Sequence, residues 1–197
     1  MAEPGELPIY PDSHRPDFAA NLLVEDDLEL NEPNEEDAEE LFSLVEENRE
    51  YLREWLPWLD DVSSVEDEKS LIRMEAQKKG SSKIYLIRIS GRIVGVLGLN
   101  WVDWDNRSFG LGYWLSEDST GQGIITKSCS RLIDHCFTNL RLHRSVIEAA
   151  VENHSSISVA ERLGMRLEGT SRDREWLYDH YVDSVMYAIT SSEWKKD

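Results

Sequence analysis

The sequence has little of what marks secreted or membrane proteins. Its two cysteines, Cys129 and Cys136, stand on one predicted helix, where a spacing of seven residues puts their backbones about 10 Å apart, beyond the reach of a disulfide. No apolar run approaches the length of a membrane span, and residues 1–6 are acidic where a signal peptide would be basic. We therefore expect a cytoplasmic protein with no membrane segment, in which both cysteines pack into the core.

Basic side chains are scarce in the first third of the chain. Residues 1–68 hold 23 acidic side chains and three arginines, a net charge of −20, whereas residues 69–197 hold 16 acidic and 18 basic side chains, a net charge of +2. This uneven distribution argues against a general acidic coat, and the lack of a basic patch disfavours nucleic-acid binding. Two interpretations stay open: the acidic third attracts a cationic ligand, or it is a solvated helix face with an acidic tail.

The most informative segment runs from Trp114 to Thr126, where a predicted strand passes through a pair of glycines into a helix. Gly121 and Gly123 let the backbone approach a ligand closely, and the helix after them points unpaired N–H groups and its positive dipole end at the same place. This arrangement suits a phosphate or pyrophosphate, although a tight turn without a ligand uses the same residues. The candidate anion-binding residues are Thr120, Gly121, Gln122, Gly123, Ile124, Ile125 and Thr126.

A second strand and helix come after the glycine turn and its helix. An apolar strand spans residues 145–151, and residues 153–156, Asn-His-Ser-Ser, then open a helix that stops at Gly164. This order of strand, glycine turn, helix, strand, Asn-x-x-Ser and helix resembles the acetyl-CoA-binding half of the GNAT N-acetyltransferase superfamily. Its signature at the glycine turn is Arg or Gln, two residues, Gly, one residue, then Gly or Ala. Here Thr120, Gly123 and Ile125 stand at those positions, so only the middle glycine matches.

Further segments narrow the resemblance to the ribosomal-protein-serine/alanine N-terminal acetyltransferase subfamily. Residues 48–58, Asn-Arg-Glu-Tyr-Leu-Arg-Glu-Trp-Leu-Pro-Trp, look like its Asn-Arg-x-x-Leu-x-x-Trp-Leu-Pro-Trp stretch. Residues 111–115, Leu-Gly-Tyr-Trp-Leu, look like its Ile-Gly-Tyr-Trp-Leu strand. Residues 160–165, Ala-Glu-Arg-Leu-Gly-Met, resemble its x-Glu-Lys-x-Gly-Phe segment. The resemblance covers roughly residues 28–190. Asn31 is a departure from it, because relatives usually carry Arg there.

The chain is predicted to form one domain, residues 23–197, after an extended, proline-rich arm, residues 1–22. Asn34 with Asp37 and Ser64 with Asp67 are capping pairs that open two helices. The first helix has its apolar side at Ala38, Leu41, Val45 and Leu52. Strands are expected at 28–30, 84–89, 93–99, 109–115, 145–151 and twice within 166–189, and helices from 34, 64, 124 and 155. This order predicts an α/β (α+β) fold, a mixed, mostly antiparallel sheet of about six to seven strands with helices on both faces. It is the GNAT fold that the resemblance implies.

The resemblance implies direct attack of an amine on the thioester carbonyl of acetyl-CoA. It puts Glu175 at the position of the proposed base, and an ion pair with Arg172 or Arg174 is the alternative role of this carboxylate. Glu148, inside an otherwise apolar strand, is the second candidate for the base, although a salt bridge at the sheet edge would also explain it. Ser156 matches the serine of Asn-x-x-Ser and could donate to the leaving thiolate, or it could only cap its helix.

Other residues are candidates for binding. The amide of Asn153 can pair with the peptide-like pantetheine arm, with helix capping as its alternative role. The backbone N–H groups of Trp114 and Leu115 could hold the thioester oxygen and the pantetheine if the strand is splayed there. Aromatic residues are candidates for the walls of the acceptor pocket, although several also suit the core: Trp55, Trp58, Trp101, Trp104 and Tyr113. The histidines have no metal-ligand spacing, so no metal is expected.

We therefore predict an acetyl-CoA-dependent N-acetyltransferase. Its expected acceptor is a basic peptide or a protein N-terminus, and ribosomal proteins are the substrate class that the resemblance implies. An enzyme of the same fold that acts on a small amine, such as a polyamine or an amino sugar, suits the acidic third equally well. A non-catalytic acetyl-CoA-binding module is the other alternative, because Thr120 and Ile125 depart from the signature, and a homodimer is left open.

Overall fold

The structure is a computed structural model that describes residues 15–78 and 80–194. Within them, eight strands form one sheet in the order β1-β2-β3-β4-β5-β6-β8-β7. The strands are β1 (Asn21–Glu25), β2 (Leu28–Asn31), β3 (Lys83–Ile89), β4 (Arg92–Asp103), β5 (Ser108–Leu115), β6 (Arg144–Ala150), β7 (Arg166–Leu177) and β8 (His180–Thr190). The helices are α1 (Ala38–Arg53), α2 (Val65–Gln77), α3 (Ile124–Thr138) and α4 (His154–Arg162), with short 3-10 helices η2 (Glu35–Asp37), η3 (Pro57–Asp61) and η4 (Glu117–Ser119).

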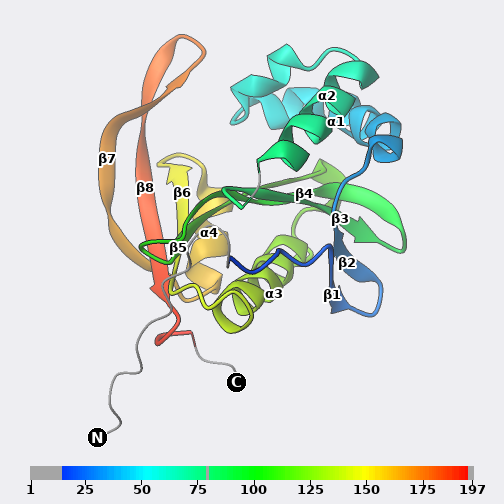
Figure 1. Ribbon diagram of the computed structural model, residues 1–197. Helices are drawn as coiled ribbons and strands as arrows, with labels where there is room; N and C mark the ends of the chain where they lie inside the picture. The colour runs from blue at the N-terminus through cyan, green and yellow to red at the C-terminus, as the bar shows by residue number, and fades with distance from the viewer. Residues whose placement is uncertain (1–14, 79, 195–197) are drawn as a thin grey trace, which may run out of the picture.

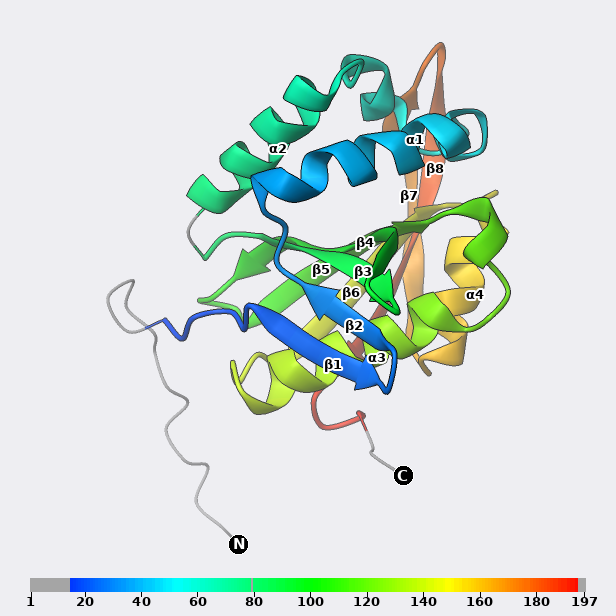
Figure 2. The same cartoon turned by 90° about the vertical axis from the view of Figure 1, so that its right-hand side faces the viewer.

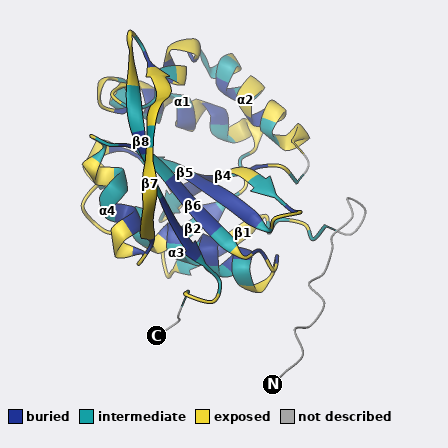
Figure 3. Cartoon of the chain, turned by 90° about the vertical axis from the view of Figure 1, so that its left-hand side faces the viewer, coloured by how far each residue is buried: buried dark blue, intermediate teal, exposed yellow. Residues whose placement is uncertain are grey.

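The sheet lies between two helical layers, α1 and α2 on one face and α3 and α4 on the other (Figures 1 and 2). All neighbouring strands are antiparallel except β5 and β6, so the predicted mixed, mostly antiparallel fold is confirmed. The main core lies under α3, where Cys129 and Cys136 are fully buried free thiols whose pKa values are raised by burial. The central strands are buried, whereas the edge strand β7 is exposed along most of its length (Figure 3).

The predicted starts of the first two helical segments are confirmed. Asn34 Oδ1 accepts a hydrogen bond from the N–H of Glu36 (2.8 Å), and Asp37 accepts one from the N–H of Asn34 (3.0 Å), which completes the capping box before α1. Ser64 Oγ accepts the N–H of Asp67 (3.2 Å) at the start of α2. The four apolar residues predicted to face the core from α1 are all buried: Ala38, Leu41, Val45 and Leu52.

Sequence patterns missed β1. This strand pairs with β2 and brings the sheet to eight strands, one more than the upper end of the predicted range. The predicted boundary of the arm at residue 22 falls inside β1, and Phe18 and Ala19 before it pack against the core. Residues 1–14, most of the predicted arm, lie outside the described residues. A five-residue strand among acidic residues shows too little apolar alternation to be recognised, and its pairing with β2 defines it instead.

β5 and β6 diverge after a short parallel stretch. Their register begins at Ser108 and Arg144 and ends at Leu111 and Ile147. Beyond this point β5 is paired with β4 alone and β6 with β8 alone. We call this divergence of β5 and β6 the fork. It leaves one edge of each strand without a strand partner, in the middle of the sheet, as predicted for the end of β5.

Candidate active site

The glycine turn follows directly after β5 and η4. Gly121 and Gly123 have φ angles of 73° and 77°, in the left-handed region that glycine adopts without steric cost. Gly123 is the N-cap of α3 and brings no capping side chain, so the first N–H groups of the helix are left without a side-chain cap. The structure describes every residue of α3, and the first turn of this helix has no acidic side chain. N–H groups without a side-chain cap, the positive end of the helix dipole and a first turn of α3 without carboxylates suit an anion.

Several predicted cofactor residues serve the turn itself. Thr120 Oγ1 donates to the main-chain oxygen of Glu117 (2.7 Å), and Gln122 Nε2 donates to that of Asp118 (3.2 Å). The side chain of Ile124 is buried, and that of Ile125 packs against the same core. Main-chain N–H groups and the half-buried Thr126 are therefore what this segment offers to a ligand.

Trp114 and Leu115 stand on β5 beyond the fork. The ring of Trp114 packs with residues of α1, on the other face of the sheet from α3, and Leu115 belongs to the main core. Their side chains are thus occupied. The N–H of Ser116 donates to the main-chain oxygen of Val94 in β4, so Trp114, two residues before it, also directs its main-chain groups toward β4. Those of Leu115 point to the strand edge that β6 leaves, where they are available to a ligand.

Two hydroxyl groups meet where β5 passes the start of α4. Tyr113 Oη lies 3.0 Å from Ser156 Oγ, and it donates to the main-chain oxygen of Ser156 (3.2 Å). Burial raises the pKa of Tyr113, so the phenol keeps its proton. Asn153 Oδ1 caps α4 by accepting the N–H of Ser156 (3.0 Å). Tyr113, which sequence patterns predicted for the acceptor wall with Trp55 and Trp58, is thus hydrogen-bonded to Ser156.

The two candidate bases lie on one face of the sheet. Ala150, two residues after Glu148 on β6, is opposite Ser184 of β8. Glu175 of β7 is opposite Val182, two residues before Ser184 on the same strand. Residues two apart on a strand, and residues opposite each other, share a face, so Glu148 and Glu175 do as well. Glu148 forms an ion pair with Arg174 (2.8 Å), the salt bridge that was its alternative role. Among the described residues, Glu175 has no ion-pair partner, so its alternative pairing with Arg172 or Arg174 is not found.

The predicted aromatic wall is divided between two places. Trp55 lies just after α1, and Trp58 lies in η3, where it is 41% exposed. Trp104 is a core residue at the opposite end of β4, with its indole N–H donating to the main-chain oxygen of Gly80 (2.6 Å). Trp101 also lies toward that end, opposite Gly110. The sequence could not separate the four tryptophans, because all of them follow similar polar and apolar patterns.

The tip of the β7–β8 hairpin is tied to the end of α1. Tyr178 donates from its hydroxyl to the main-chain oxygen of Arg53 (2.5 Å), and the Arg53 guanidinium lies 4.4 Å from the Tyr178 ring centroid. Arg53 also makes two hydrogen bonds to Asp60, at 2.6 and 2.7 Å. Figure 1 shows the hairpin rising beside the fork to the level of α1 and α2. These contacts fix the position of β7, and with it that of Glu175.

Residues 48 and 49, which carried part of the resemblance, support the site. Asn48 Oδ1 accepts the N–H of Glu117 (2.9 Å), which connects α1 to the segment before the glycine turn. Arg49 donates to the main-chain oxygens of Leu59 (2.6 Å) and Val62 (2.5 Å) and so holds η3 against α1. Neither role was predicted, because both depend on contacts between residues distant in sequence.

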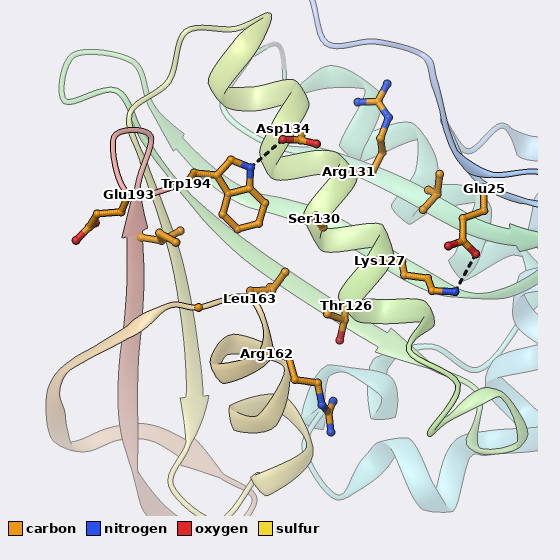
Figure 4. Close-up of a pocket in the computed structure, with 13 residues that line it drawn as sticks. Glu25, Thr126, Lys127, Ser130, Arg131, Asp134, Arg162, Leu163, Glu193 and Trp194 are labelled. Carbon is orange, nitrogen blue, oxygen red and sulfur yellow. Dashed lines mark hydrogen bonds and ion pairs between the residues drawn. The ribbon is translucent and has the colours of Figure 1, made fainter. Parts of the chain in front are cut away.

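A groove of 620 Å³ opens on the α3 side of the molecule, beside the first turns of that helix. It lies between α3, β1, the end of α4 and the segment after β8, and of the predicted cofactor residues it includes only Thr126. Figure 4 shows two contacts among the residues that line it: Lys127 pairs with Glu25 (2.8 Å), and the indole N–H of Trp194 donates to Asp134 (2.8 Å). Arg162 extends from α4 at its margin, with no ion-pair partner among the described residues.

Within residues 15–78 and 80–194, no three His, Cys, Asp or Glu side chains come together in a way that could hold a metal ion. None of the helices in this part of the chain is long and apolar enough to cross a membrane.

Comparison with known proteins defines the class to which this fold and site belong. The model of the acetyltransferase (GNAT) domain matches residues 27–166. The chain is 34% identical over 169 residues to the ribosomal-protein-serine acetyltransferase of Escherichia coli (strain K12), covering 85% of this chain and 94% of that protein. It is also 34% identical over 173 residues to the putative ribosomal N-acetyltransferase YdaF of Bacillus subtilis (strain 168), covering 85% and 92%.

A solved structure agrees with these sequence matches. RimL, a ribosomal α-N-protein acetyltransferase in complex with coenzyme A, superposes with a TM-score of 0.83 at 32% identity, over 86% of this chain and 97% of that one. The protein belongs to the GNAT acetyltransferase family. It is an acetyl-CoA-dependent N-acetyltransferase, similar to enzymes named for ribosomal proteins.

Proposed function

We propose that the enzyme acetylates the α-amine at the start of a polypeptide chain, and that the reaction takes place at the fork. The observation that carries the proposal is the position of the fork between two different surfaces. On one face lie the glycine turn, α3 and α4, and on the other lies the acid-rich layer of α1, η3 and α2. The names of the similar enzymes, which specify ribosomal-protein serine or ribosomal N-acetylation, support the same acceptor.

Acetyl-CoA would lie on the α3 and α4 face. The N–H groups of the glycine turn and of the first turn of α3 would hold the pyrophosphate, and the groove beside Thr126 and Lys127 has the size for the distal nucleotide. Asn153 uses only its Oδ1 in capping α4, so its Nδ2 remains a donor for an amide oxygen of the pantetheine arm. The main-chain groups of Leu115 on the open edge at the fork would receive the thioester end.

The acceptor amine would approach from the acidic face. Burial raises the pKa of Tyr51 on α1, and the carboxylates of Glu117 in η4 and of Glu54, just after α1, raise it further. Carboxylates on this face would attract a cationic amine. An α-amine, with a reference pKa near 8, is about a tenth neutral at pH 7, whereas a lysine amine, near 10.4, is almost wholly charged. Direct attack therefore favours the α-amine.

The residues at the fork divide the chemistry between them. As the amine nitrogen bonds to the carbonyl carbon and the C–S bond breaks, the amine loses a proton and the sulfur gains negative charge. Glu175 would take the amine proton, because Glu148 is already bound to Arg174. The hydroxyl pair of Ser156 and Tyr113 would donate a hydrogen bond or a proton to the sulfur. Acetyl-CoA supplies the activated acetyl group, and the products are an N-acetylated chain and free coenzyme A.

The test is thiol release from acetyl-CoA with an acceptor panel. Basic peptides that begin with Ser or Ala would be compared with polyamines and amino sugars of similar charge, and each product would be identified by mass spectrometry. We expect release with the peptides and much less with the small amines. Release with small amines alone would keep the GNAT chemistry and reject the polypeptide acceptor. Binding of acetyl-CoA without release in either set would favour a non-catalytic module.

A further inference from the structure

β4 contains a bulge opposite β5. The register passes from Leu99 opposite Leu111 to Trp101 opposite Gly110, so Asn100 is an additional residue in β4. A bulge of this kind re-aims side chains, and two successive residues can then lie on one face of the sheet. Gly110 lies on the same face as Trp114, four residues further along β5. This is the face covered by α1, because Trp114 packs there.

Two glycines of β5 make room for the bulged side chains. A Cβ atom on Gly110 would lie 2.2 Å from Trp101 Nε1, and one on Gly112 would lie 2.3 Å from Asn100 Nδ2. Neither position could carry a side chain without displacing its neighbour. The side chains of Asn100 and Trp101 therefore lie close against Gly112 and Gly110 of β5, and we call this pair the ledge.

The side chains of the ledge are exposed to solvent, and their polar groups make no hydrogen bond to the described residues. Asn100 is exposed, and Trp101 is 42% exposed although its ring is held against the sheet. Across residues 15–78 and 80–194, neither the Asn100 carboxamide nor the Trp101 indole N–H has a hydrogen-bond partner within the protein. Polar groups that are held in place but not satisfied internally are suited to binding a ligand.

The ledge begins at the fork. Gly112, beneath Asn100, is the first residue of β5 without a partner on β6. Gly110, beneath Trp101, is two residues away, about 7 Å along the strand. Glu148, the first residue of β6 beyond the fork, lies on the same face, because Val146, two residues before it, is opposite Gly110. A ligand whose reacting end is at the fork would thus continue over Asn100 to Trp101.

We propose that the ledge binds the main chain of the acceptor polypeptide just after its reacting amine; this rests on the proposed function. A carboxamide has one acceptor and two donor hydrogens, which match a peptide group, and the indole N–H can donate to a second carbonyl. A chain advances at most about 3.5 Å per residue, so the second and third residues of the acceptor span the ledge. Polyamines and amino sugars have no peptide groups to place there. The ledge therefore selects polypeptides over small amines of equal charge.

The experiment measures how kcat/KM depends on acceptor length. Serine amide and Ser-initiated peptide amides of two, three and six residues would be compared in the wild type, Asn100→Ala and Trp101→Ala. We expect kcat/KM of the wild type to rise by about tenfold as the second and third residues are added, the effect of one or two hydrogen bonds. Both variants should lose most of this rise, with serine amide turned over as in the wild type.

Two more variants sharpen the test. Gly110→Ala keeps the indole but moves it from its place, so it should act like Trp101→Ala. Trp176→Ala removes a tryptophan that is 53% exposed on the edge strand β7, and it should keep the full length dependence. A rise with length that is unchanged in Asn100→Ala and Trp101→Ala would overturn the ledge and leave the proposed function standing. A wild type that ignores peptides and acetylates only small amines would overturn both.

Discussion

Glu68 on α2 gives a prediction whose size follows from the structure. Its side chain faces the interior, where the residue is 3% exposed, and it has no hydrogen-bond partner among the described residues. Burial raises its pKa from 4.5 to about 7, against the opposing attraction of the Arg49 guanidinium. The folded protein therefore holds a proton on this carboxyl at pH values where the unfolded chain has released it.

The effect of Glu68 on stability follows from the difference in proton binding between the folded and the unfolded state. Below pH 4.5 the carboxyl is protonated in both states and does not affect stability. Between pH 4.5 and 7 the folded state binds more protons than the unfolded state, so the free energy of unfolding falls as the pH rises. A difference of 2.5 pKa units at 1.36 kcal/mol each gives about 3 kcal/mol of destabilisation at pH 8, an upper value. Glu68→Gln, which is neutral at every pH, removes this penalty.

Urea unfolding of the wild type and Glu68→Gln at pH 5, 6, 7 and 8 measures the difference. We expect an advantage of the variant of about 1 kcal/mol or less at pH 5 that grows to about 3 kcal/mol at pH 8, or about 6–12 °C in melting temperature. Glu66→Gln, on the exposed side of the same helix, should run parallel to the wild type, because surface ion pairs contribute about 1 kcal/mol or less. A constant difference between wild type and Glu68→Gln across the four pH values would refute the reasoning.

Three further predictions concern the site. Gly123→Ala puts a side chain at φ 77° and should lower the affinity for coenzyme A at least about tenfold, as measured by calorimetry. Gly91→Ala, at φ 83° in the β3–β4 hairpin, should cost a similar ~1 kcal/mol of stability and leave the affinity unchanged. Equal affinity in both variants would contradict an anion site at the glycine turn. Ser156→Ala should lower kcat by about tenfold or more with little change in melting temperature, since the cap uses the main-chain N–H of this residue; a lower melting temperature with normal kcat would make Ser156 a structural residue only. Glu175→Gln should lower kcat and flatten its rise with pH, and a pH profile like that of the wild type would exclude it as the base.

The capping pairs and the glycine turn could be predicted from the sequence because each depends on residues close together in the chain. Asn34 with Asp37 needs a spacing of three, and the left-handed positions at Gly121 and Gly123 need only glycine. The hydroxyl of Ser156 could likewise be placed at the start of a helix. Its partner could not be foreseen, since the bond to Tyr113 joins residues 43 positions apart.

Strand alternation puts Tyr113 and Trp114 on opposite faces, and this simple rule already separates Tyr113 from a wall on the α1 side. Strand alternation fails at the bulge of β4, where Asn100 is an additional residue, and no local sequence pattern predicts this bulge. The pairing of Glu148 with Arg174 depends on a second irregularity, between Ser171 and Glu175 of β7. Sequence patterns could therefore propose the chemical groups of the site, but not the residues that each of them contacts.

The most direct test of the central claim is where the acetyl group goes. The enzyme and acetyl-CoA would be incubated with a basic peptide that has a free N-terminal Ser and internal Lys residues, and the product would be sequenced by tandem mass spectrometry. The account predicts one acetyl group, on the α-amine, and no reaction with the same peptide when its N-terminus is blocked. Acetylation of a lysine side chain, or equal reaction of the blocked peptide, would contradict it.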